Sequence, residues 1–131
     1  MSAMSESPDV ERLHRTWQAL AEGDLGAMEA ALASDARWRA IEDGPWNCEN
    51  RQAIIEVMGR NLETGLRGRI EETIQDGERI VVAFRPEQPF QGERPLDDGI
   101  AYVVVTMRDG QIVEMKGSAD RANAISYVQT G

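Results

Sequence analysis

The stretch IAYVVVTMRDGQIVEMKGS, residues 100–118, carries the strongest structural signal in the chain. It predicts two antiparallel strands, Ile100–Arg108 and Gln111–Ser118, because Asp109-Gly110 between them favours a tight two-residue hairpin. This half of the chain is therefore expected to be β.

A second hairpin is predicted directly before the first. Arg69–Gln75 and Glu78–Arg85 have the composition of strands and are joined at Asp76-Gly77, another hairpin pair. The second half of the chain thus predicts four strands in two hairpins.

The central strands are apolar on both faces. In Ile100–Arg108, Tyr102 and Val104 lie on one face, and Val103 and Val105 lie on the other. Helices gathered on one side of an antiparallel sheet cover only one of its faces. We therefore expect an α+β domain that forms a homodimer through its outer sheet face.

Helical spacing dominates the first half of the chain. It predicts a helix over residues 8–22 after Ser7, a good N-cap, and a short helix after Asp24. A strand over Ala36–Glu42 and a third helix capped by Asn50 follow.

The two ends of the chain are expected to differ. Residues 1–7 predict a disordered tail, and residues 8–131 predict a single domain. The chain is expected to close with a short helix within Ser118–Val128 that turns three residues inward: Ala122, Ile125 and Val128.

Composition excludes several classes of function. The formal net charge is -9 and no basic patch is visible, so nucleic acid and anionic membranes are not expected as partners. With 1 cysteine and 1 histidine, a structural zinc site is excluded. The sequence has neither a glycine-rich phosphate loop nor a cluster of ligand residues, so no cofactor is expected. The polar N-terminus predicts a cytoplasmic protein.

Four segments resemble the nuclear transport factor 2-like superfamily. Trp17–Leu25 is similar to its first helix junction, and Ala33–Trp38 to the entry into its first strand. Met107–Met115 resembles its closing hairpin, and Asp120-Arg121 followed by Ala124-Ile125 resembles its exit. The SnoaL-like polyketide cyclase and ketosteroid isomerase-like subgroup is the most similar.

That resemblance implies a cone: a curved sheet wrapped on three N-terminal helices, also called cystatin-like, with a pocket inside. Members are commonly dimers and often bind apolar, ring-bearing small molecules. Isomerases of the group use a tyrosine and two aspartates for their chemistry. Those positions fall on Thr16, Ala40 and Val103 here, and the acid of related cyclases falls on Gly117. The known catalytic residues are therefore not matched.

Three residues remain as catalytic candidates. Glu42 at the end of a strand could act as a base, and Arg85 or His14 could stabilise developing negative charge. Each has an ordinary alternative. Glu42 could be a solvated strand end, Arg85 could pair with Glu71 or Glu72, and His14 could be a partly exposed helix residue.

The expected site is an apolar pocket with a few polar groups. Its predicted lining combines aromatic, aliphatic and small residues: Trp17, Trp38, Ala40, Met58, Arg85, Val103, Val105, Met115 and Gly117. A small apolar molecule is the expected partner. Two alternatives stay open, a cyclase-, isomerase- or dehydratase-type enzyme without a cofactor, and a protein-interaction adaptor that uses the doubly apolar strands.

Overall fold

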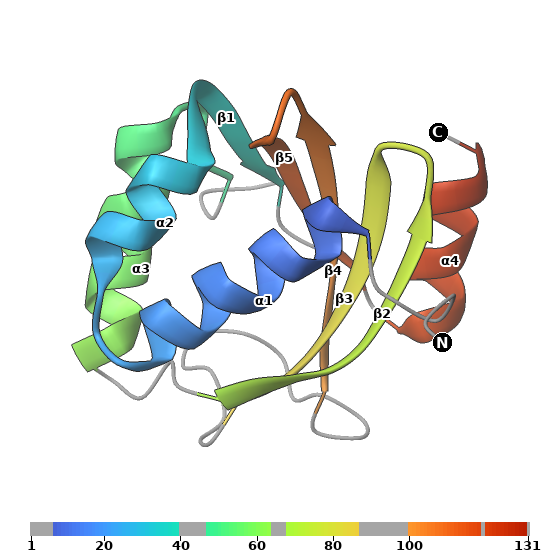
Figure 1. Ribbon diagram of the computed structural model, residues 1–131, viewed down its shortest axis with the longest axis horizontal. Helices are drawn as coiled ribbons and strands as arrows, with labels where there is room; N and C mark the ends of the chain where they lie inside the picture. The colour runs from blue at the N-terminus through green and yellow to red at the C-terminus, as the bar shows by residue number, and fades with distance from the viewer. Residues whose placement is uncertain (1–6, 40–46, 64–67, 87–99, 119, 131) are drawn as a thin grey trace.

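The computed structural model describes residues 7–39, 47–63, 68–86, 100–118 and 120–130. Within these ranges the chain forms an α+β domain, as predicted, with helices packed on a curved sheet (Figure 1). The elements, in chain order, are α1 (Pro8–Ala21), α2 (Leu25–Ala31), β1 (Leu32–Arg39), α3 (Arg51–Glu63), β2 (Gly68–Asp76), β3 (Arg79–Pro86), β4 (Ala101–Arg108), β5 (Gln111–Ser118) and α4 (Arg121–Thr130). No described helix has the length and apolarity needed to cross a membrane. The predicted tail lies outside the described residues except for Ser7.

The sheet contains both strand directions. Its order is β1-β5-β4-β3-β2, with β2 to β5 antiparallel and β1 added parallel to β5 at the edge. The predicted hairpin between β4 and β5 is confirmed, because Asp109 and Gly110 have φ of 53° and 79°, the left-handed pair that a tight turn needs.

Side-chain caps start the helices where the sequence predicts. The Ser7 side chain accepts a hydrogen bond from the Val10 amide at 3.2 Å, and Asp24 does the same for the Ala27 amide at 3.2 Å. Asn50 accepts from the Ala53 amide at 2.9 Å. Each cap satisfies an amide that the first helical turn leaves unpaired.

The first strand begins earlier than predicted. β1 follows α2 directly at Leu32 instead of starting at Ala36, because Leu32, Ala33 and Ala36 are all buried in the core. Its register shifts between Leu32 and Arg37. Residues 40–42 of the predicted strand lie outside the described residues.

The inner face of the sheet supports the main core. The alternation predicted for β4 is confirmed, since Val103 and Val105 join one cluster. Ile80, Val82 and Phe84 of β3 belong to the same cluster. α1, α2 and α3 contribute the opposing side chains, such as those of Leu13, Met28 and Ile54. Figure 1 shows α1 crossing this face.

The outer face has its own helix, which the sequence analysis placed wrongly. α4 packs on the face opposite α1, where Ala124 and Val128 cover Val81, Tyr102 and Val104. Helices therefore lie on both sides of the sheet. The prediction that Ala122 points inward is also wrong, because it is exposed and the buried pair follows an i, i+4 spacing instead.

Candidate functional site

Most of the predicted lining residues share the inner face. Five are buried in the main core, and Trp38 packs against it partly buried. These five are Trp17, Met58, Val103, Val105 and Met115. Gly117 is buried directly across from Val103 in the sheet. Ala40 lies outside the described residues.

Exposure on this face rises toward one end of the sheet. Val105 and Met115 are completely buried, whereas Val103 and Phe84 retain 8% and 5% of their surface. The helices follow the same trend, because Leu13 and Ile54 retain 0% and 2% while Trp17 and Met58 retain 8% and 7%. The inner face is thus sealed at the β4–β5 turn and less tightly closed where β3 ends and β4 begins.

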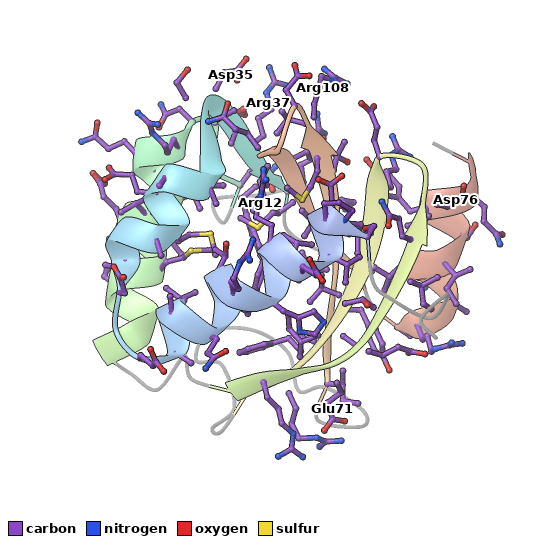
Figure 2. All side chains as sticks on the ribbon, in the orientation of Figure 1. Arg12, Asp35, Arg37, Glu71, Asp76 and Arg108 are labelled. Carbon is purple, nitrogen blue, oxygen red and sulfur yellow. The ribbon has the colours of Figure 1, made fainter. Side chains whose placement is uncertain are left out.

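Arg85 does not join these residues. It follows Phe84 along β3 and so projects to the other face. Its Nε lies 3.0 Å from a Glu71 carboxylate oxygen, which is the pairing that the sequence analysis kept as an alternative. Arg85, and after it Arg69, lower the pKa of Glu71 by hydrogen bonding to its carboxylate. Glu71 projects away from the body of the molecule (Figure 2).

The catalytic candidates are not brought together by the described residues. His14 is half-buried on α1, which covers the inner face, so the sheet separates it from Arg85. Glu42 lies outside the described residues. The buried Thr16 hydroxyl donates to the Arg12 carbonyl at 2.8 Å, so its proton is already engaged within the helix.

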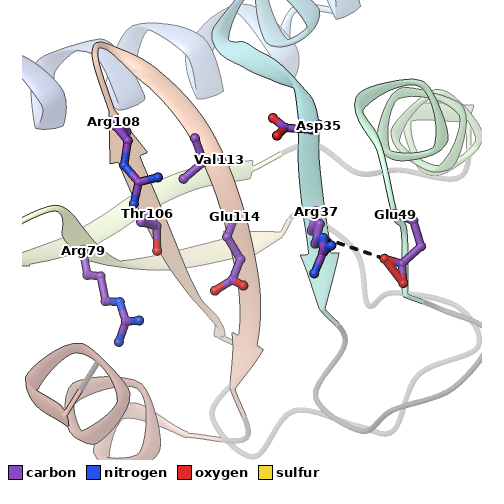
Figure 3. Close-up of a pocket in the computed structure, with 8 residues that line it drawn as sticks. All are labelled: Asp35, Arg37, Glu49, Arg79, Thr106, Arg108, Val113 and Glu114. Carbon is purple, nitrogen blue, oxygen red and sulfur yellow. Dashed lines mark ion pairs between the residues drawn. The ribbon is translucent and has the colours of Figure 1, made fainter.

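A second feature, which the sequence analysis missed, lies on the outer face. It is a depression of about 410 Å³ beside the end of the β4–β5 hairpin (Figure 3). Mostly charged side chains line it: Asp35, Arg37, Glu49, Arg79, Thr106, Arg108, Val113 and Glu114. Figure 2 shows Asp35, Arg37 and Arg108 gathered at one end of the molecule, with Glu71 at the other.

A continuous row of cross-strand partners forms the floor of this outer depression. Arg37 of β1 pairs with Glu114 of β5, Glu114 with Thr106 of β4, and Thr106 with Arg79 of β3. Adjacent partners in a sheet stand about 5 Å apart, so four strands present their polar groups to one place. Finding the row requires the strand register, which sequence spacing alone does not supply.

Tyr127 of α4 organises the acidic and basic groups of the row. Its hydroxyl donates to Glu114 at 2.7 Å, and Arg39 Nε lies 3.3 Å from the other Glu114 carboxylate oxygen. Arg79 stacks on the Tyr127 ring, 4.5 Å from its centre, and donates to the Tyr127 carbonyl at 2.8 Å. Burial, followed by the hydrogen bond to Glu114, raises the pKa of Tyr127.

Thr106 is the unusual member of the row. The residue is 9% exposed, and its hydroxyl oxygen is buried with no hydrogen-bond partner among the described residues. An unsatisfied buried polar group is destabilising by about 1–3 kcal/mol, so such groups are rare in native proteins. Within the described ranges, no three His, Cys, Asp or Glu side chains are placed to hold a metal ion.

Solved structures define the class of fold. A nuclear transport factor 2-like protein of unknown function from Burkholderia pseudomallei is 25% identical, with a TM-score of 0.67 over 94% of this chain and 98% of that one. A Xanthomonas campestris protein of unknown function with a cystatin-like fold is 14% identical, with a TM-score of 0.67 over 89% and 95% of the two chains. The chain has the nuclear transport factor 2-like fold.

The family follows from the sequence match. The SnoaL-like domain family matches residues 10–115, and the chain belongs to that family. TerC, co-crystallised with polyporic acid, is 21% identical, with a TM-score of 0.66 over 95% of this chain and all of that one, 100%. No curated protein matches the chain significantly.

Proposed function

We propose that this SnoaL-like domain binds a small, apolar, ring-bearing molecule at the inner face of its sheet. The binding place lies where Trp17, Met58, Phe84 and Val103 meet. The observation that carries the proposal is the graded burial of this face: these four buried side chains retain 5–8% of their surface, whereas Leu13, Ile54, Val105 and Met115 retain 0–2%.

The chemistry of these residues suits such a ligand. The indole of Trp17 and the phenyl ring of Phe84 offer flat apolar surfaces, and the flexible side chain of Met58 adapts to the shape of what it contacts. Gly117 across from Val103 adds no side chain to the strand at this point. TerC, a structural neighbour, was co-crystallised with polyporic acid.

Binding without catalysis is favoured over the enzymatic alternative. The positions of the known catalytic groups are Thr16, whose hydroxyl is bonded within α1, and Val103 and Gly117, which have no ionisable group. α4 covers the apolar part of the outer face, on which both the adaptor alternative and the predicted homodimer were based. The homodimer stays a prediction, to be measured by sedimentation.

Native mass spectrometry of the protein purified from cells tests the proposal. A retained small mass is expected, and it should be lost in Val103→Phe, where the added ring occupies the binding place. Ile125→Phe introduces the same ring on α4, on the opposite face, and should keep the mass. Equal loss in both variants, or equal retention in both, would contradict the proposal. Circular dichroism establishes that both variants fold.

A further inference from the structure

We propose that the outer depression is a second binding site, one that takes the oxyanion of a small molecule between the Arg79 guanidinium and the Thr106 hydroxyl. The oxyanion is a carboxylate or a phosphate group. This site lies on the opposite face of the sheet from the proposed apolar site, so neither depends on the other.

The unsatisfied Thr106 hydroxyl is the first observation that supports a ligand at this place. Its oxygen is buried, lacks a hydrogen-bond partner among the described residues, and belongs to a residue that lines the depression (Figure 3). A hydroxyl in this position donates readily to an anionic oxygen, and such a bond to a charged group is about twice as strong as a neutral one. Binding an oxyanion would remove the cost of leaving this group unsatisfied.

Arg79 supplies the charge. It donates once, to the Tyr127 carbonyl, and stacks on that ring, but it forms no ion pair with a carboxylate of the described residues. A guanidinium has five N–H donors in a rigid fork that matches carboxylate and phosphate oxygens. Stacking on Tyr127 holds the fork in place, so little side-chain entropy would be lost on binding.

Two of the three acids that line the depression, Glu114 and Glu49, interact with groups other than Arg79. Glu114, the acid nearest Thr106 in the row, is engaged through both oxygens by Tyr127 and Arg39. Glu49 lies 3.9 Å from Arg37 at the β1 side of the depression. Arg108, 3.6 Å from Glu78, adds a second guanidinium to the lining on the β4 side. Arg79 is thus left to bind an anion from outside.

The size of the depression sets the ligand class. A volume of about 410 Å³ falls within the usual range for small-molecule sites, roughly 300–1,000 Å³. The lining is charged and not apolar, unlike the inner face. A small polar metabolite bearing one oxyanion fits both properties.

The test is an NMR titration of the full chain with sodium acetate and, separately, sodium phosphate, at an ionic strength held constant with sodium chloride. Saturable shifts are expected at the Arg79 side-chain Nε–H and the Thr106 amide. Whichever anion saturates at the lower concentration identifies carboxylate or phosphate as the group recognised. Shifts with neither anion would overturn the proposal.

Three variants make the result specific. Arg79→Gln should abolish the saturable shifts, and Thr106→Val, which keeps the shape and removes the hydroxyl, should weaken binding about tenfold or more. Arg69→Gln changes the net charge by the same amount, but Arg69 lies near the start of β2, far from the end of β2 that pairs with Arg79. This variant should bind the anion as the original chain does. Unchanged affinity in Thr106→Val would overturn the role of the hydroxyl and with it the proposal.

A second copy of the chain is the competing occupant. In that case the Thr106 and Arg79 resonances would shift with protein concentration in the absence of either anion, and sedimentation velocity would show association over the same range. That result would overturn the small-molecule proposal. Concentration-independent resonances that move only with added oxyanion are the expected outcome.

Discussion

The two faces of the sheet differ in composition and in what covers them. The inner face is apolar along its whole length and is covered by α1, α2 and α3. The outer face is divided. Its apolar part lies under α4, and its other part displays Arg37, Glu114, Thr106 and Arg79 in a row beside the depression.

The difference teaches where stability and recognition reside. Contacts on the inner face are non-directional and depend on the apolar area removed from water, so many residues contribute to the stability of the fold. Contacts on the charged part of the outer face depend on placed donors and acceptors, and a single change there alters recognition more than folding. Mutations on the two faces should therefore separate these effects.

The largest effect is expected from the sealed end of the inner face. Met115 is completely buried, so Met115→Ala leaves a cavity and should lower the free energy of unfolding by about 3 kcal/mol. Urea denaturation measures the change. Val113→Ala, on a half-buried neighbour, serves as the control and should cost less than half as much. Equal costs would show that complete burial of Met115 adds nothing to the cost of shortening a β5 side chain.

Removing α4 from the outer face should lower the free energy of unfolding by less than Met115→Ala does, but it should also make the protein associate in solution. Val128→Asp places a charge against Val81, Tyr102 and Val104, which should detach α4 and cost about 2 kcal/mol from the lost apolar burial. The uncovered face should then associate, which sedimentation velocity detects. Ala122→Asp on the exposed side of α4 should leave both stability and association nearly unchanged. Association in both variants would mean that α4 is not the cover.

The inner face could be predicted from the sequence, because its information is local. Alternation along β4, the Asp109-Gly110 turn, and caps such as Ser7 and Asn50 act over a few residues, and each predicted its element correctly. The Asp76-Gly77 pair predicted its turn one residue too early, because Asp76 pairs with Arg79 and the turn is Gly77-Glu78.

The outer face could not be predicted in the same way, because it depends on long-range packing. α4 has little amphipathic pattern, and its two buried residues, Ala124 and Val128, are small. Nothing local indicates that this helix crosses to the far side of the sheet. The polar row joins residues from position 37 to position 114, and only the register of four strands aligns them.

Tyr127 links α4 to the polar row, and its ionisation provides an intermediate test. Burial, with the hydrogen bond to Glu114, raises the pKa of Tyr127 above its usual value of 10.0. Folding therefore favours the protonated phenol. This stabilisation is fully present below the usual pKa and is lost as the pH rises through the higher folded-state value.

Tyr127→Phe should cost about 1 kcal/mol at neutral pH, because it removes the hydrogen bond to Glu114. The difference between the variant and the original chain should shrink as the pH rises past 10.0. Urea denaturation across the alkaline range measures it, and absorbance of the remaining tyrosinate, from Tyr102, provides the reference titration. A difference that stays constant with pH would show that the Tyr127 phenol is not held in its protonated form.

The smallest effect is expected at the exposed ion pair that links α4 to the edge strand β2. Arg121 Nε lies 3.0 Å from a Glu72 carboxylate oxygen, with both side chains about half exposed, so Arg121→Gln should destabilise the fold less than any change above. Arg121, through its hydrogen bonds, lowers the pKa of Glu72 below its usual value of 4.5. The contribution is therefore present above that value and is lost as the pH falls through the lower folded-state pKa.

Comparing the original chain with Arg121→Gln by urea denaturation at neutral and acidic pH measures this contribution, and the two should converge in acid. High salt should also reduce the difference, because the pair is exposed to solvent. A cost that exceeds that of Val128→Asp would reverse the comparison. It would mean that charge, and not apolar burial, holds α4 against the outer face. The part of this face under α4 and the charged part would then both depend on ionic contacts.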